Sequence, residues 1–280
     1  MKTLLAVVSD GTAASVLETA LLVARRFGSR IVGLNALTTE YAVVFGGEMG
    51  FSISSEVDRT LEREGHDRRE QARSLFASFM REHGIPIGAA VGGGPSAEWR
   101  EEAGRQNAVV GAVGRVFDLI IVERPAKLAS LAEATLEDAL FESGRPVLMA
   151  PPTPPASIGE RVLVAWNGST ETARTVGFAM PFLDRAKSVQ VVSVEGGMTP
   201  GPSGEELAQS LTRHGIATIA RHVAPRDRTT GQVFLDEAKA IGADLMVKGA
   251  YTQSRLRQMI FGGATRHIIM EATMPVILAH

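Results

Sequence analysis

The sequence has no cysteine among its 280 residues, which excludes disulfide bonds, thiolate nucleophiles and zinc–thiolate sites. Positive charge is not in excess either. The formal net charge of −2 argues against nucleic acid or an anionic membrane as a partner. The six histidines lack metal-ligand spacing, so no metal site is expected. Long apolar runs are also missing, and Leu4 to Val8 is too short for a signal peptide or a membrane span. We therefore expect a cytoplasmic protein.

Proline is concentrated at one place in the chain. Four of the 13 prolines fall within five positions, at Pro151, Pro152, Pro154 and Pro155. Such a run cannot continue a helix or a central strand, and it favours an extended, semi-rigid spacer. We predict a linker at 151–157 between two domains, 1–150 and 158–280, whose lengths are ordinary for single domains.

The two sides of this linker repeat one pattern. Each side begins with an apolar run that ends in Asp or Asn, Gly and a hydroxyl residue, and two further apolar strands follow in the same order. The matched pairs are 4–12 with 161–169, 118–122 with 244–248, and 145–150 with 274–279. Three matches in one order indicate an internal repeat.

Strand and helix patterns alternate along the second half. Strands are predicted near 161–166, 188–194, 217–223, 244–248 and 275–279, and helices near 170–182, 204–214, 230–241 and 263–272. The strands are continuous apolar runs, which is typical of a parallel sheet covered on both faces. We predict an α/β fold with two doubly wound, Rossmann-like, five-stranded, mostly parallel sheets.

The first half follows this plan with additions. We predict a Gly-rich loop at 38–54, a long charged helix at 55–83, and an extra segment at 92–104 that contains Trp99. The neighbouring acids Glu98, Glu101 and Glu102 are interpreted as a solvated helix face. These additions indicate either an elaborated surface or a surface for a protein partner that the sequence does not name.

The last strand of each half is an apolar edge that invites aggregation unless it is covered. We therefore predict that 145–150 pairs with 274–279 and forms an internal pseudo-dimer. This pairing leaves homodimerisation of the full chain open.

A glycine-rich segment follows the predicted fourth strand of the second half. Gly249 directly follows that strand, and Gly262 and Gly263 precede the next helix. Bare backbone N–H groups and the positive end of a helix can bind phosphate at such a place. Asn167 ends the first strand at the same edge of the sheet, where ligands bind in doubly wound folds.

With these residues the chain resembles the universal stress protein family in its tandem form. The resemblance implies an adenine nucleotide alpha-hydrolase-like fold, pairing of domains through the last strand, and an Asp at the end of the first strand. It also implies a Gly-x2-Gly-x9-Gly-Ser/Thr nucleotide loop. The corresponding candidate site consists of Asn167, Gly249, Thr252, Gly262, Gly263, Ala264 and Thr265.

The candidate site departs from the family pattern at three positions. Thr252 replaces the second glycine, Gly263 replaces the hydroxyl residue, and Asn167 replaces the acid. The cations Lys248, Arg255, Arg257 and Arg266 either attract phosphate or form an ordinary solvated face.

The corresponding loop of the first half has lost its glycines. Pro125 removes an N–H donor, and Glu123 and Glu133 would repel a phosphate. Asp10 survives at the end of the first strand, where a helix cap is its simplest role. Only the second half is therefore expected to bind a nucleotide.

No nucleophile elbow, metalloprotease motif or Walker A sequence occurs, so no catalytic residue is predicted. We expect a non-enzymatic stress-response or regulatory protein that binds ATP or another adenine nucleotide in the second domain. The alternatives are a ligand-free interaction scaffold and a slow ATPase.

Overall fold

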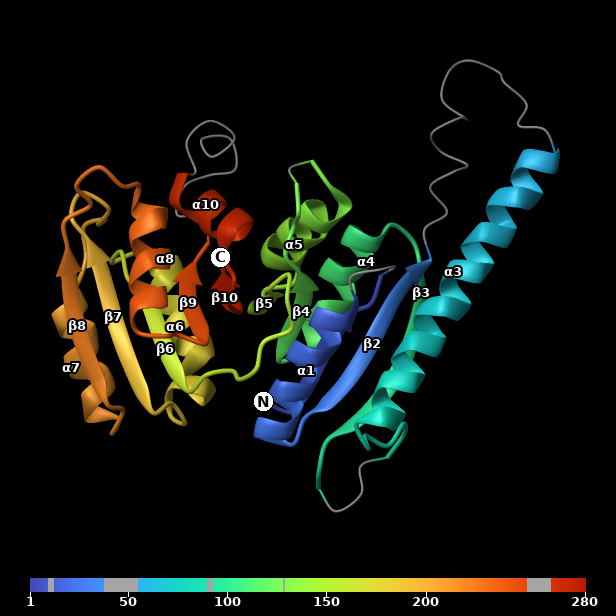
Figure 1. Cartoon of the computed structure of the whole chain (residues 1–280), viewed down its shortest axis with the longest axis horizontal. Helices are drawn as coiled ribbons and strands as arrows, with labels where there is room; N and C mark the ends of the chain where they lie inside the picture. Colours follow the sequence, from blue (N-terminus) through green and yellow to red (C-terminus); the bar gives the residue numbers. More distant parts are fainter. Residues whose placement is uncertain (10–12, 38–54, 90–92, 128, 251–262) are drawn as a thin grey trace.

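The computed structural model describes residues 1–9, 13–37, 55–89, 93–127, 129–250 and 263–280, with side chains from residue 65 onward in the long helix. These residues form one continuous sheet with helices on both faces (Figure 1). In this part of the chain, no helix is long and apolar enough to cross a membrane.

Ten strands build the sheet in the order β3-β2-β1-β4-β5-β10-β9-β6-β7-β8. The strands of the first half are β1 Thr3–Val7, β2 Arg30–Leu37, β3 Ser96–Ala103, β4 Leu119–Glu123 and β5 Val147–Ala150. Those of the second half are β6 Arg161–Ala165, β7 Ser188–Val194, β8 Thr218–Val223, β9 Leu245–Gly249 and β10 Val276–Ala279. Each half therefore has the same order, with its first strand central and its chain connections crossing over in parallel.

The helices cover the sheet in two layers with separate apolar cores. One face carries α1 Ala13–Phe27, α3 Ser55–Glu82, α6 Thr170–Leu183 and α7 Gly204–Arg213. The other carries α4 Gln106–Val113, α5 Leu131–Glu142, α8 Thr230–Ala240 and α10 Gly263–Glu271. A short 3-10 turn, Gly114–Val116, follows α4. The α/β fold class is confirmed, and the second-half elements lie where the sequence predicts them.

The two halves join through their last strands. β5 and β10 pair antiparallel, with Leu148 opposite Ile277, whereas all other strand pairs of the described sheet are parallel. Every residue of both strands is buried. The two apolar edges thus cover each other, as expected, and the two five-stranded sheets become one ten-stranded sheet.

The segment around Trp99 corrects two predictions. It contains β3, the third strand of the fold, and is therefore no addition to it. The three glutamates consequently lie on a strand and not on a helix. Glu98 pairs with Arg30 of β2, the Trp99 indole donates to Glu101 (2.7 Å), and Arg100 donates to Glu102 (2.6 Å). The strand reads as polar because it is the outer edge of the sheet, where charged side chains discourage further pairing.

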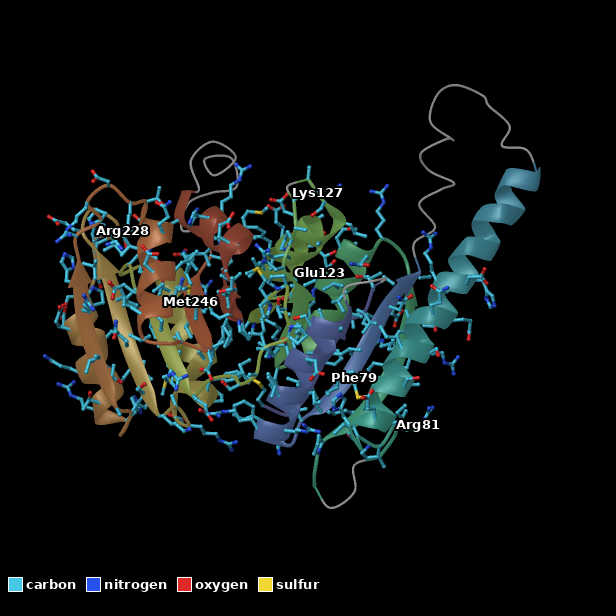
Figure 2. All side chains as sticks on the ribbon, viewed as in Figure 1. Phe79, Arg81, Glu123, Lys127, Arg228 and Met246 are labelled. Atoms are coloured by element: carbon cyan, nitrogen blue, oxygen red, sulfur yellow. The ribbon has the colours of Figure 1, made fainter. Side chains whose placement is uncertain are left out.

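The long helix α3 packs on the sheet through its second half. Phe76 lies over Gly33 of β2, where a Cβ would come within 2.5 Å of the phenyl ring, and contacts Trp99 at a centroid distance of 5.2 Å. Figure 2 shows Phe79 on the side of α3 that faces the sheet and Arg81 on its outer side. The helix predicted at 55–83 is thus present, and its C-terminal half is held by aromatic packing.

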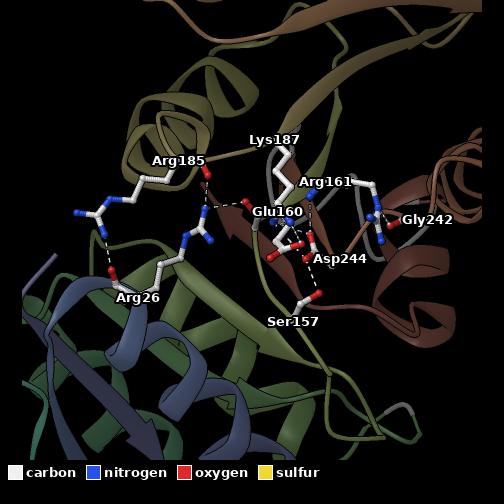
Figure 3. A network of polar contacts seen from close by, with 9 residues as sticks. Arg26, Ser157, Glu160, Arg161, Arg185, Lys187, Gly242 and Asp244 are labelled. Atoms are coloured by element: carbon white, nitrogen blue, oxygen red, sulfur yellow. Dashed lines mark hydrogen bonds and ion pairs between the residues drawn. The ribbon is translucent and has the colours of Figure 1, made fainter.

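A second contact between the halves lies beside the strand pair (Figure 3). The ends of α1 and α6 meet there, with the rings of Phe27 and Phe182 in an edge-to-face arrangement at 4.9 Å. Arg26 donates to the Arg185 carbonyl (2.6 Å), and Arg185 in turn donates to the Arg26 carbonyl. This exchange of equivalent bonds is what a local two-fold axis between two similar domains produces.

Each half also fixes its first strand with an aspartate that precedes its fourth strand. Asp118 accepts the backbone N–H groups of Lys2 and Thr3, and Asp244 accepts those of Glu160 and Arg161. Partial burial by itself raises the pKa of Asp118, but these backbone hydrogen bonds outweigh it and hold the pKa below its ordinary value of 3.8. The two halves therefore share this set of aspartate hydrogen bonds as well as the matching sequence.

We expect Asp118→Ala and Asp244→Ala each to lower the free energy of unfolding by about 1–2 kcal/mol, because charged hydrogen bonds to strand N–H groups are lost. The lowered pKa of Asp118 means that its stabilisation is complete above its unfolded pKa and disappears as the pH falls through the folded value. The difference between wild type and Asp118→Ala, measured by urea unfolding, should therefore shrink below pH 4. A difference that is the same at pH 7 and pH 3 would contradict this.

Candidate functional site

The predicted site residues of the second half lie at the carboxyl ends of β6 and β9 and at the start of α10. Asn167 follows β6, Gly249 ends β9, and Gly263, Ala264 and Thr265 form the first turn of α10. Thr252 and Gly262 lie outside the described residues, as do Arg255 and Arg257. The same applies to Asp10 in the first half.

Asn167 and Gly249 meet at the N-terminus of α6. The side-chain oxygen of Asn167 accepts from the Thr172 hydroxyl (2.6 Å) and from the Ser169 N–H (3.2 Å). Gly249 lies against the same turn, because a Cβ there would be 2.4 Å from the Thr172 nitrogen and 2.8 Å from the Glu171 carbonyl carbon. Close packing of strand on helix thus explains this glycine, independently of any ligand.

The connection after β7 covers the end of β6. Thr199 donates its backbone N–H (2.8 Å) and its hydroxyl (3.0 Å) to the Asn167 carbonyl. The Trp166 indole donates to the Pro202 carbonyl (2.8 Å), and a Cβ at Gly201 would lie 2.5 Å from the Gly168 oxygen. Residues 199–202 are therefore fixed over the first-strand end of the candidate site.

A buried lysine lies beneath the first turn of α10. The Lys248 ammonium donates to the Thr265 hydroxyl (2.9 Å) and to the Gly249 carbonyl (2.7 Å). Both acceptors are neutral, and Lys248 is only 7% exposed. Burial lowers the pKa of Lys248 to about 8, because the low-dielectric interior disfavours the charged form.

The first turn of α10 differs from that of a capped helix. This turn contains no acidic residue, and none of the described residues comes within 4 Å of the place where a Cβ on Gly263 would be. Among the described residues, no group of three or more potential metal ligands occurs here or elsewhere. The arrangement suits an anion, which a helix N-terminus and a buried ammonium both attract.

The equivalent place in the first half is closed by its own carboxylate. Glu133 accepts the Ala129 N–H (2.5 Å) through its side chain, and its own N–H is accepted by the Ser130 hydroxyl (3.2 Å). The two side chains thereby cap α5. The helix terminus that would attract a phosphate is satisfied internally by a negative charge, in line with the repulsion that the sequence predicts for Glu133.

Comparison with known proteins assigns the second half of the chain to a family. Residues 159–280 match the model of the Universal stress protein family. The second half of the chain is a universal stress protein domain. Comparison with curated proteins found no match.

Solved structures extend the likeness to both halves. A universal stress protein from Archaeoglobus fulgidus DSM 4304 aligns with a TM-score of 0.70 at 16% identity, covering 99% of this chain and 95% of its own. A functionally unknown protein from Pseudomonas aeruginosa PAO1 aligns with a TM-score of 0.54 at 15% identity, covering 100% and 92%. At these identities the likeness establishes the fold. The half that precedes the universal stress protein domain thus shares its architecture.

Sequence reasoning missed two features of this domain. Thr172, which links Asn167 with Gly249, carries no signal beyond its position in the first turn of a helix. Lys248 was considered either as a cation that attracts phosphate or as part of a solvated face, and its burial was not predicted, although its place in the apolar run 244–248 could have indicated it. The matched position in the first half, Val122, is apolar and buried, which is the signal that could have found it.

We expect Gly249→Ala to lower the free energy of unfolding by about 1–3 kcal/mol, because the new methyl group would press on the backbone of α6. Gly263→Ala is the matched control. Its Cβ contacts no described residue, and alanine favours the helix, so stability should be unchanged or slightly higher. Urea unfolding of both variants measures the contrast. Equal effects of the two substitutions would contradict the packing described for Gly249.

Proposed function

We propose that this chain is a non-enzymatic regulatory protein of the stress-response type, which binds ATP or another adenine nucleotide in its second half. The observation that carries the proposal is the contrast between two matched helix N-termini. That of α5 is capped by the carboxylate of Glu133, whereas the first turn of α10 is free of acidic residues and has Lys248 beneath it. Only the second arrangement favours a phosphate group.

The sequence around α10 supports the same charge argument. From 245 to 270 the chain contains Lys248, Arg255, Arg257 and Arg266 and no aspartate or glutamate. Local cations without local acids attract a polyphosphate without internal competition. This composition contrasts with the matched part of the first half, which contains Glu123 and Glu133.

A regulatory role fits the side chains that gather at this edge. The predicted site residues and their described partners offer hydroxyl, amide and ammonium groups, and the carboxylate of Glu171, in the first turn of α6, is beside Thr170. General acid–base chemistry on a bound nucleotide would need a positioned base within hydrogen-bond reach of the reacting atoms. Binding therefore suits this edge better than the slow hydrolysis of ATP.

The ligand-free scaffold is the second candidate. It is favoured by the bonds that engage Asn167, whose side-chain oxygen and carbonyl are both used within the protein. In that case the end of β6 is a purely structural joint, and the partner would be a protein. Binding of ATP to the full chain separates the two candidates.

Gly263→Glu tests the proposal by copying the acid of the first half into the second. A Cβ at this position meets no atom of the described part of the chain, and an acid in the first helical turn is favourable, so folding should be preserved. Repulsion of phosphate should weaken ATP binding about tenfold or more, as measured by calorimetry on the full chain. Gly263→Gln, which has the same shape without charge, should keep affinity within about threefold of wild type. Absence of ATP binding to the wild-type chain would favour the scaffold instead.

A further inference from the structure

Lys248 is a buried positive charge without a matching negative charge among the described residues. It takes part in no ion pair there, and its two hydrogen bonds go to a carbonyl and a hydroxyl. Burial of an unpaired charge is costly, and such groups usually have a partner, shift their protonation or serve a function. An anionic partner for Lys248 is thus missing among the described side chains.

The titratable groups around Lys248 do not supply one. On the strands and the helix that surround it they are Arg161, Asp244, Arg266, His267, Glu271 and His280. Helix α6 also packs on β9, but it covers the opposite face of the sheet from α10, and the carboxylate of its Glu171 accepts from the Thr170 hydroxyl (3.2 Å). Asp244 caps the opposite end of β9, about 13 Å away along the strand, and Glu271 ends α10, about 12 Å from its start. His267 packs on Gly231, and the His280 ring lies 3.3 Å from the Ala250 carbonyl.

The neighbouring helix α8 has acids, but they are engaged elsewhere. Asp236 pairs with Arg228 (2.9 Å), and Glu237 pairs with Arg221 of β8 (3.2 Å). The strand neighbours of Lys248 are apolar, Ala165 on β6 and Leu278 on β10. The segment 251–262 contains no acidic residue in its sequence. No acidic side chain in the part of the chain that the structure describes therefore supplies the countercharge of Lys248.

The position of the ammonium group indicates where that anion binds. Thr265, to which it donates, is the third residue of α10, so Lys248 reaches the first turn from below. We propose that the ammonium group of Lys248 is the fixed countercharge of the phosphate bound at the start of α10, so that binding takes up a proton under alkaline conditions. This role of Lys248 rests on the proposed function, and it would make the affinity for ATP depend on pH.

Stability of the free protein gives a first check. A lysine whose pKa is lowered to about 8 by burial leaves the folded chain with fewer protons than the unfolded chain between pH 8 and its ordinary value of 10.5. Stability should therefore rise as the pH increases through this range, and Lys248→Met should remove the rise. The variant should also be at least as stable as wild type at pH 7, because no charge is buried.

Calorimetry of ATP binding to the full chain at pH 8.5, in two buffers of different ionisation enthalpy, tests the proposal itself. The terminal phosphate of ATP has a second pKa of about 6 and therefore stays ionised from pH 7.5 to pH 9.5. Wild type should take up between about half and one proton per ATP, and its affinity should fall about tenfold from pH 7.5 to pH 9.5. Lys248→Met should bind ATP more weakly at pH 7.5, without proton uptake and with a flat pH profile.

The outcomes separate this inference from the proposed function. ATP binding by wild type without proton uptake, or equal uptake by wild type and Lys248→Met, overturns the role of Lys248 and leaves the proposed function standing. Failure of wild type to bind ATP overturns both.

Discussion

The antiparallel pair of β5 and β10 is the contact on which the rest of the structure depends. Each strand is the apolar edge of a five-stranded sheet, and the pairing covers that edge, so that together with the helices on both faces all four residues of each strand are buried. Their pairing makes one ten-stranded sheet and brings the ends of α1 and α6 together, where Arg26 and Arg185 exchange equivalent bonds. A domain–domain contact of this kind within one chain avoids the loss of translational freedom that association of two separate chains costs.

The two halves share one fold, but the N-termini of their matched helices α5 and α10 differ in charge. Both halves keep the aspartate that fixes the first strand and a threonine in the helix after the fourth strand. The hydroxyl of Thr135 accepts from Gln106 of α4, whereas that of Thr265 accepts from Lys248. In the first half the group that donates to the threonine of α5 is therefore a neutral amide, and Glu133 caps the helix. In the second half the donor to the threonine of α10 is the buried Lys248 ammonium. We ascribe the proposed ligand preference to this difference of a few side chains on one architecture.

Much of the fold could be predicted from the sequence because parallel strands buried on both faces are continuous apolar runs, as in 118–122 and 244–248. β3 could not, since Trp99 and its glutamates form a polar edge strand that lacks this signal. The candidate site was predictable only as a region. Glycine spacing points to Gly249, but its tight packing on Thr172 is a tertiary contact, and the burial of Lys248 depends on strands and a helix distant in sequence. Local patterns identify elements, whereas the partners of single side chains arise only on folding.

The central claim is that two halves of one fold differ in their capacity to bind a nucleotide. Native mass spectrometry of the full chain with ATP counts bound nucleotides per chain directly. The account predicts one nucleotide per chain, bound in the half that contains α10. Two nucleotides per chain, or none, would contradict it.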